Sequence, residues 1–259
     1  MNRLKKKIDD VQAQQGKVLA LFLTAGYPKL HDTARIVLDL EKGGADVVEL
    51  GMPFSDPLAD GPVIQKSSSI ALSNGFKLET LLRQVRQIRR ESDIPLVLMG
   101  YLNPILSFGA DEFFAAASRA GVDGVILPEL PFEEADAFSQ LLEANKLSQI
   151  LLVAPTTPPA RIEAIDAASH GFLYCVSTTG VTGSDGKAPM NEYIMNVKAH
   201  AKKNPVLVGF GIATPADAKR YARYSDGVII GSALIRRLSE SGQKGKLREW
   251  VRGFKKELC

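Results

Sequence analysis

Residues 18–28 read VLALFLTAGYP, a short apolar run that ends in a turn-forming Ala-Gly-Tyr-Pro segment. A run that is apolar at nearly every position indicates a strand buried on both faces, as in parallel sheets covered by helices. An open sheet that binds dinucleotides would carry a glycine fingerprint directly after this strand, and residues 23–28 lack one. The stretch therefore favours a closed barrel over a doubly wound open sheet.

Seven further apolar runs follow along the chain, at residues 46–50, 95–100, 123–127, 148–153, 171–176, 205–210 and 226–231. The segments between them have apolar residues at helical spacing. Eight strand-helix units predict an α/β fold, a (β/α)₈ TIM barrel in which residues 1–259 form a single domain. Leu4, Ile8 and Val11 are spaced as on one face of a helix, which predicts an extra N-terminal helix over the closed end of the barrel.

Composition and charge argue against several classes of protein. The 32 Lys and Arg residues, against 29 Asp and Glu, lie in scattered pairs that we interpret as solvated helix faces, so no nucleic acid is expected. The longest apolar run, residues 18–25, is too short for a membrane span, and no signal peptide precedes it. Cys175 and Cys259 lie far apart, which suits a reducing compartment and offers no metal-site spacing. A cytoplasmic protein without a metal is therefore expected.

Two carboxylates stand out in residues 47–62, which read VVELGMPFSDPLADGP. Glu49 alternates with Val47, so its side chain should point into the barrel near the open end, where burial tends to raise the pKa of a carboxyl group. Asp60 lies in the following loop and is the second candidate. A structural glutamate satisfied by backbone amides, and a turn aspartate before Gly61-Pro62, are the alternatives.

A second region has the features of a phosphate site. Gly209-Phe210-Gly211-Ile212 ends the seventh run, and Gly231-Ser232-Ala233 ends the eighth directly before a helix, where barrels bind phosphate with backbone amides. Residues 177–187 are rich in glycine and hydroxyl groups and long enough to form a lid. Strand alternation predicts that the Tyr174 side chain points toward the mouth of the barrel. It is either a core tyrosine or a substrate contact.

With these residues in view, the chain resembles the alpha subunits of tryptophan synthase over nearly its whole length. The matching segments are residues 23–28 (LTAGYP), 49–62 (ELGMPFSDPLADGP), 101–104 (YLNP), 180–183 (GVTG) and 209–212 (GFGI). The second is the most specific, because unrelated phosphate-binding barrels share the glycines without that loop.

The resemblance implies retro-aldol cleavage of indole-3-glycerol phosphate to indole and glyceraldehyde 3-phosphate. Glu49 would be the acid–base group, and Asp60 would accept the indole N–H and stabilise positive charge on the ring. No cofactor is expected in this chain. Indole would pass to a beta subunit that holds pyridoxal phosphate, in an assembly of two alpha and two beta chains.

Other roles carry over position by position. Tyr174 would lie beside Glu49, and Phe22 and Leu127 would line the indole pocket. Thr182 would bond to Asp60 when the lid closes. The substrate phosphate would lie among residues of three loops: Gly183, Phe210, Gly211, Gly231 and Ser232. The sequence departs from the family at Glu129, where Asp is frequent, and at Ser184-Asp185, where many members have Ala-Arg.

Three other functions compete with this one. The first is another phosphate-binding barrel, such as a sugar-phosphate isomerase or aldolase; a Schiff-base aldolase would require a lysine at a strand end, and none of the eight runs provides one. A catalytically silent subunit that only activates its partner is disfavoured by the presence of both Glu49 and Asp60. A stand-alone lyase that releases free indole is also compatible with the sequence, and an indole-release assay with and without a beta subunit would distinguish it.

Overall fold

The computed structural model describes residues 2–176, 190–209, 211–240 and 246–259. Strands and helices alternate along the chain, and every strand pair in the sheet is parallel. The strands are β1 (Val18–Thr24), β2 (Val47–Gly51), β3 (Leu96–Met99), β4 (Gly124–Ile126), β5 (Ser148–Gln149), β6 (Leu152–Val153), β7 (Leu173–Val176), β8 (Val206–Gly209) and β9 (Gly227–Ile230).

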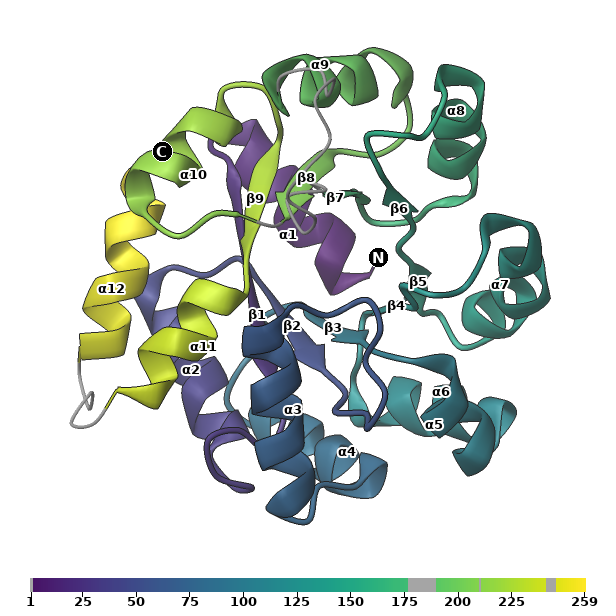
Figure 1. Cartoon of the computed structure of the whole chain (residues 1–259), viewed down its shortest axis with the longest axis vertical. Helices are drawn as coiled ribbons and strands as arrows, with labels where there is room; N and C mark the ends of the chain where they lie inside the picture. The colour runs from purple at the N-terminus through teal and green to yellow at the C-terminus, as the bar shows by residue number, and fades with distance from the viewer. Residues whose placement is uncertain (1, 177–189, 210, 241–245) are drawn as a thin grey trace.

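Helices surround the strands, which lie together at the centre of Figure 1. They are α1 (Arg3–Ala13), α2 (Thr33–Gly43), α3 (Pro62–Ser73), α4 (Leu78–Arg89), α5 (Leu102–Phe108), α6 (Ala110–Ala120), the 3₁₀ turn η1 (Phe132–Glu134), α7 (Ala135–Ala144), α8 (Pro159–Ala168), α9 (Met190–His200), α10 (Pro215–Ala222), α11 (Ser232–Ser239) and α12 (Lys246–Lys255). Within the described ranges, no helix is long and apolar enough to cross a bilayer.

The sheet closes through a strand that changes partners along its length. The run at 148–153 was predicted as one strand, but it forms two short segments: β5 pairs with β4, and β6 pairs with β7. Hydrogen bonds continue between them, because Ile150 N–H donates to Val125 O at 3.0 Å and Tyr174 N–H donates to Leu151 O at 3.0 Å. The predicted barrel is confirmed, and its fifth strand joins the two edges of the sheet.

Alternate strand residues face two different cores. One cluster of buried residues fills the inside of the barrel and includes Ala20, Val47 and Val97. The other lies between the strands and the helices and includes Val48 and Leu50. This separation is the period of two that a pleated strand imposes, and it confirms the directions predicted for β2.

The N-terminal helix α1 closes one end of the barrel, as predicted. Leu4 and Ile8 are 0% and 1% exposed and belong to the same cluster as the inward strand residues. Burial of each side chain contributes about 2 kcal/mol. Figure 1 shows α1 at the centre of the ring of helices. A site for a ligand would therefore lie at the opposite end, where strands run into loops.

Four side chains that lie just before strands β2, β4, β7 and β9 bind the backbone of the neighbouring strand that precedes each of them in the barrel. Asp46 accepts from Leu19 N, Asp123 from Leu96 N and Asp226 from Val206 N, at 2.7–2.9 Å, while the Ser169 hydroxyl accepts from Leu151 N at 3.1 Å. We call Asp46, Asp123, Ser169 and Asp226 the strand-start clamps. Each of the three aspartates also donates its own N–H to the carbonyl of the residue it clamps.

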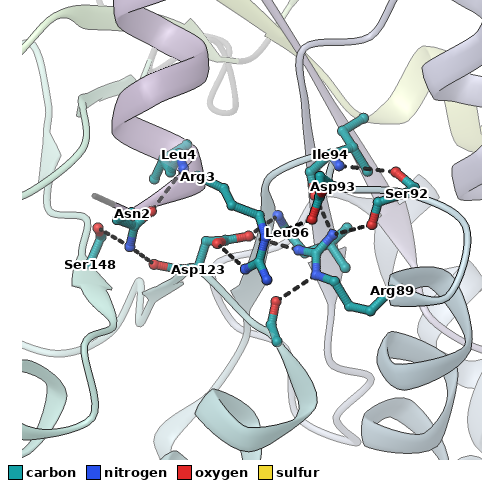
Figure 2. Close-up of polar contacts among 11 residues, drawn as sticks. Asn2, Arg3, Leu4, Arg89, Ser92, Asp93, Ile94, Leu96, Asp123 and Ser148 are labelled. Carbon is teal, nitrogen blue, oxygen red and sulfur yellow. Dashed lines mark hydrogen bonds and ion pairs between the residues drawn. The ribbon is translucent and has the colours of Figure 1, made fainter.

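The clamp at Asp123 also ties down two helices (Figure 2). Arg3 of α1 and Arg89 of α4 reach its carboxylate at 2.9 and 2.7 Å. Asn2, which caps α1 through its side chain, donates to Asp123 O at 2.8 Å. The Asp123 side chain is only 3% exposed. These contacts fix the closing helix to the barrel wall.

Candidate active site

An open cavity of about 350 Å³ lies over the carboxyl ends of the strands. This is the end at which barrels of this kind place their chemistry. The lining comes from loops and strand ends all round the barrel: Phe22, Asp60, Gly61, Ile64, Met99, Tyr174, Gly211, Ile212, Ala213, Ile229, Gly231, Ser232, Ala233 and Arg236.

Glu49 is buried in β2 beside this cavity. It pairs in register with Phe22 of β1 and Val97 of β3, and it is 0% exposed. Neither of its carboxylate oxygens has a hydrogen-bond partner among the described residues, so backbone amides of these residues do not satisfy it. Burial without a compensating partner raises the pKa of Glu49 to about 8. At neutral pH this side chain is a protonated acid.

Asp60 lies half-buried in the loop between β2 and α3 and lines the cavity. Burial raises the pKa of its carboxyl group to about 6, and a hydrogen bond from the Tyr101 hydroxyl opposes part of that rise. Asp60 is therefore mostly ionised at neutral pH while Glu49 is mostly protonated. When the environments of two carboxyl groups in one site separate their pKa values, the group with the higher pKa can act as an acid. The group with the lower pKa stays ionised and can stabilise positive charge.

Tyr174 and Phe22 complete the wall near the carboxylates. Tyr174 is 4% exposed, and its pKa is raised by burial and further by the charges of Glu49 and Asp60. Its ring lies against Gly209, where an added Cβ would stand 2.4 Å from the phenolic oxygen. A Cβ on Gly51 would stand 2.4 Å from the Phe22 ring. Glycine at both positions leaves room for the aromatic rings.

The other end of the cavity is suited to an anion. Gly211, in the left-handed region at φ 75°, lies on one side, and Gly231 with Ser232 at the start of α11 lies on the other. Free backbone N–H groups at a helix start attract negative charge. Ser232 and Arg236 lie one helical turn apart on α11, and both line the cavity. Among the described residues of this lining, Arg236 is the only Lys or Arg.

The structure brings together only some of the residues predicted for the site. Leu127 is 9% exposed and packs with the outer core, and it does not line the cavity. Its neighbour Pro128 lines a narrow extension of the cavity that also contacts Asp60. Thr182, Gly183 and Phe210 lie outside the described residues, as does the whole predicted lid at residues 177–187.

Two site residues were not predicted. Arg236 was interpreted as part of a solvated basic pair, and only the cavity reveals its place. Tyr101 appears in the sequence only within a segment that matches the family, but its hydroxyl accepts from Ala59 N at 2.9 Å, beside Asp60, and lowers the pKa of that carboxyl group. The four-residue spacing from Ser232 could have indicated Arg236. Nothing in the local sequence indicates the contact between Tyr101 and Asp60.

No group of three or more His, Cys, Asp and Glu side chains that could hold a metal ion occurs in the part of the chain that the structure describes. The fold and the cavity thus define a TIM barrel whose pocket is lined by one carboxylate, Asp60, beside the buried Glu49, and by glycines and a helix start that carry free N–H groups.

Comparison with known proteins narrows this class to one family. The model of the family described as tryptophan synthase alpha chain matches residues 8–256. The tryptophan synthase alpha chains of Petrotoga mobilis and Flavobacterium johnsoniae are 46% and 44% identical, and each alignment covers 97% of this chain and 98% of the relative. The chain belongs to the tryptophan synthase alpha chain family.

Solved structures agree with that assignment. The tryptophan synthase alpha subunit of Legionella pneumophila superposes with a TM-score of 0.91 at 38% identity, covering 100% of this chain and 98% of the other. A tryptophan synthase chain from M. tuberculosis, in an aminoacrylate-bound form, gives 0.89 at 33% identity, with both chains fully covered.

Proposed function

We propose that this chain cleaves indole-3-glycerol phosphate to indole and glyceraldehyde 3-phosphate, the alpha half-reaction of tryptophan synthesis. The observation that carries the proposal is a pair of carboxyl groups with separated pKa values: about 8 for Glu49, buried beside the cavity, and about 6 for Asp60, which lines it. An anion site at the other end of that cavity suits the substrate phosphate. The reaction needs one neutral acid and one fixed negative charge, and the pair supplies both.

Glu49 begins the reaction as a neutral acid. It donates its proton to the indole ring carbon that bears the side chain, and that carbon becomes tetrahedral. The ring then carries positive charge on its nitrogen, and ionised Asp60 accepts the N–H and stabilises that charge.

The carbon–carbon bond then breaks, and its electron pair returns to the ring to regenerate neutral indole. The adjacent hydroxyl of the side chain becomes the aldehyde of glyceraldehyde 3-phosphate, and its proton returns to the Glu49 carboxylate. Glu49 ends as it began, so no external acid, base or redox partner is consumed.

The remaining residues bind and orient the substrate. We assign Phe22 to the indole ring and Tyr174 to a contact beside Glu49, while Leu127, which lies outside the cavity lining, keeps only the role expected from the family resemblance. Gly211, Gly231 and Ser232 are assigned to the phosphate, and Arg236 adds a positive charge next to them. Thr182, Gly183 and Phe210 keep the roles expected from the family resemblance: Thr182 bonding to Asp60, and the other two at the phosphate.

The alpha chain of tryptophan synthase implies a beta subunit as partner. We propose that two alpha and two beta chains assemble in the cytoplasm, and that indole passes to the beta subunit. Pyridoxal phosphate belongs to that partner, and the chemistry assigned to this chain requires no cofactor of its own.

Indole release from indole-3-glycerol phosphate, with and without a beta subunit, tests the proposal. Glu49→Gln and Asp60→Asn should each lower kcat by at least about a hundredfold, because each removes a group that acts in the transition state. Binding of inorganic phosphate should change little. The exposed Glu79→Gln is the matched control and should retain full turnover. Losses below about tenfold in both variants would overturn the roles of the two carboxylates.

A further inference from the structure

Asp60 occupies a loop, although its carboxylate must be held accurately against a ring nitrogen. Residues 52–61 contain no helix or strand, and Asp56 and Leu58 in this loop are exposed. The backbone of Asp60 is held by Pro57 O at 3.1 Å and by the Gln65 side chain at 2.9 Å. Neither contact fixes the direction of the carboxylate.

Tyr101 supplies that direction from the next loop of the barrel. It follows β3, and its side chain is buried, with the residue 6% exposed. The hydroxyl accepts from Ala59 N at 2.9 Å, and Tyr101 and Asp60 line the same narrow pocket, where the hydroxyl lowers the pKa of the Asp60 carboxyl group. The ring packs on Phe54 with centroids 5.3 Å apart. One side chain therefore contacts the Asp60 loop at Phe54 and at Ala59, next to Asp60.

Glu129 fixes the backbone beside Tyr101 from a third loop. It lies after β4, and its carboxylate accepts from the N–H of Leu102, the first residue of α5. A carboxylate at this position also interacts favourably with the positive end of the helix dipole. Glu129, which departs from the family pattern, thus holds Leu102, the residue next to Tyr101.

We propose that Tyr101 is a positioning residue for Asp60 and that Glu129 holds Tyr101 in place, so that three successive loops act as one support. The inference deepens the proposed function and depends on it for the activity measurements. The support also determines the charge state of Asp60. A hydrogen bond donated to a carboxylate favours its ionised form and lowers its pKa.

Asp60 acts while ionised, so kcat should fall as the pH drops through its pKa, near 6 in the wild type. Tyr101→Phe removes the donor, raises that pKa and moves the acid limb of the kcat profile upward by about one pH unit. KM should change less than twofold, because Tyr101 acts on a group that works in the transition state.

The experiment measures kcat and KM for indole-3-glycerol phosphate from pH 5 to 9 in wild type, Tyr101→Phe and Tyr224→Phe. Tyr224 is a half-buried tyrosine outside the cavity and serves as the matched control. A variant that lost activity only through poorer folding would lose it equally at every pH. An acid limb that stays within 0.2 pH units of the wild type would overturn the role of Tyr101.

Glu129 is tested in the same way. Glu129→Gln should shift the acid limb in the same direction by a smaller amount, and Glu129→Asp should restore part of it. Glu134→Gln, in the same segment before α7, is the control. A Glu129→Gln profile identical to wild type would remove Glu129 from the support and leave Tyr101 acting alone.

A second measurement does not depend on turnover. The Asp60 carboxyl carbon can be titrated by NMR in labelled protein, in wild type and in Tyr101→Phe. An upward shift in the variant supports the inference even if the wild type releases no indole, a result that would instead overturn the proposed function. Identical titrations in both proteins would overturn the inference while leaving the proposed function intact.

Discussion

Glu49 stays protonated at neutral pH because the barrel interior gives its charge no partner among the described residues. The same burial makes stability depend on pH. Below the ordinary pKa of 4.5, the carboxyl group is neutral in both folded and unfolded chains. Between 4.5 and about 8, only the folded chain holds the proton, so stability from this group falls as the pH rises through the folded pKa.

Glu49→Gln should remove this pH dependence, since an amide does not titrate. The wild type should lose up to about 1.4 kcal/mol per pH unit relative to the variant across this range. Urea unfolding at pH 5, 6.5 and 8 measures the difference, which should be small at pH 5 and largest at pH 8. The exposed Glu79→Gln should follow the wild type. Parallel curves for wild type and Glu49→Gln would mean that the buried carboxyl group titrates normally.

The direction of Glu49 could be predicted from sequence because strand alternation is local and needs only its neighbours Val47 and Val48. Tyr101 and Arg236 could not be assigned in this way. Tyr101 meets Asp60 across two loops, at a distance of 41 residues along the chain. A charged side chain such as that of Arg236 can lie in solvent as readily as in a cavity. Its partner in the cavity would be a ligand, which the sequence does not contain. Long-range contacts of this kind are set by the closed barrel.

At the scale of elements, the predicted strand runs match the observed strands closely, because burial on both faces leaves a continuous apolar signal. No signal in the sequence marks the division of residues 148–153 into β5 and β6. It arises because this strand must pair with β4 at one end and with β7 at the other as the sheet closes. Pairing between distant strands decides the boundary, and the local residues are equally apolar on both sides.

The Asp123 clamp gives a prediction for stability. Asp123→Ala removes the acceptor for Leu96 N, Arg3 and Arg89, and it leaves Arg89, whose side chain is 10% exposed, without its carboxylate. Breaking a buried pair in this way costs about 3 kcal/mol or more.

Asp93→Ala is the matched control, since Asp93 binds the same Arg3 at 3.1 Å but is 92% exposed (Figure 2). Exposed pairs contribute about 0–1 kcal/mol. Chemical denaturation of the two variants should therefore differ by at least about 2 kcal/mol. Equal losses would show that Asp123 has no special part in holding α1 to the barrel.

At the scale of the whole molecule, the mouth of the barrel carries apolar surface that the fold itself does not cover. Leu58 is 95% exposed and Leu106 is 52% exposed. Nearby, Pro53, Phe54, Pro104 and Phe108 line a shallow groove of about 380 Å³. An apolar rim around the exit of a cavity is suited to a partner that receives the product.

Leu106→Asp should therefore weaken binding of a tryptophan synthase beta subunit by at least about tenfold and reduce mutual activation, because it places a charge in an apolar interface. Met195, on α9, is 55% exposed, so Met195→Asp is a control of matching exposure away from this rim. Isothermal titration calorimetry with the beta subunit measures both. If Leu106→Asp binds as tightly as Met195→Asp, the partner does not use α5.

The strand-start clamps divide the barrel into consecutive pairs of strands. Asp46 joins β1 and β2, Asp123 joins β3 and β4, Ser169 joins the strand formed by β5 and β6 to β7, and Asp226 joins β8 and β9. A circularly permuted chain opened between two pairs keeps every clamp and its acceptor strand within one continuous segment. Opening it inside a pair would separate the two partners of a clamp to opposite ends of the polypeptide.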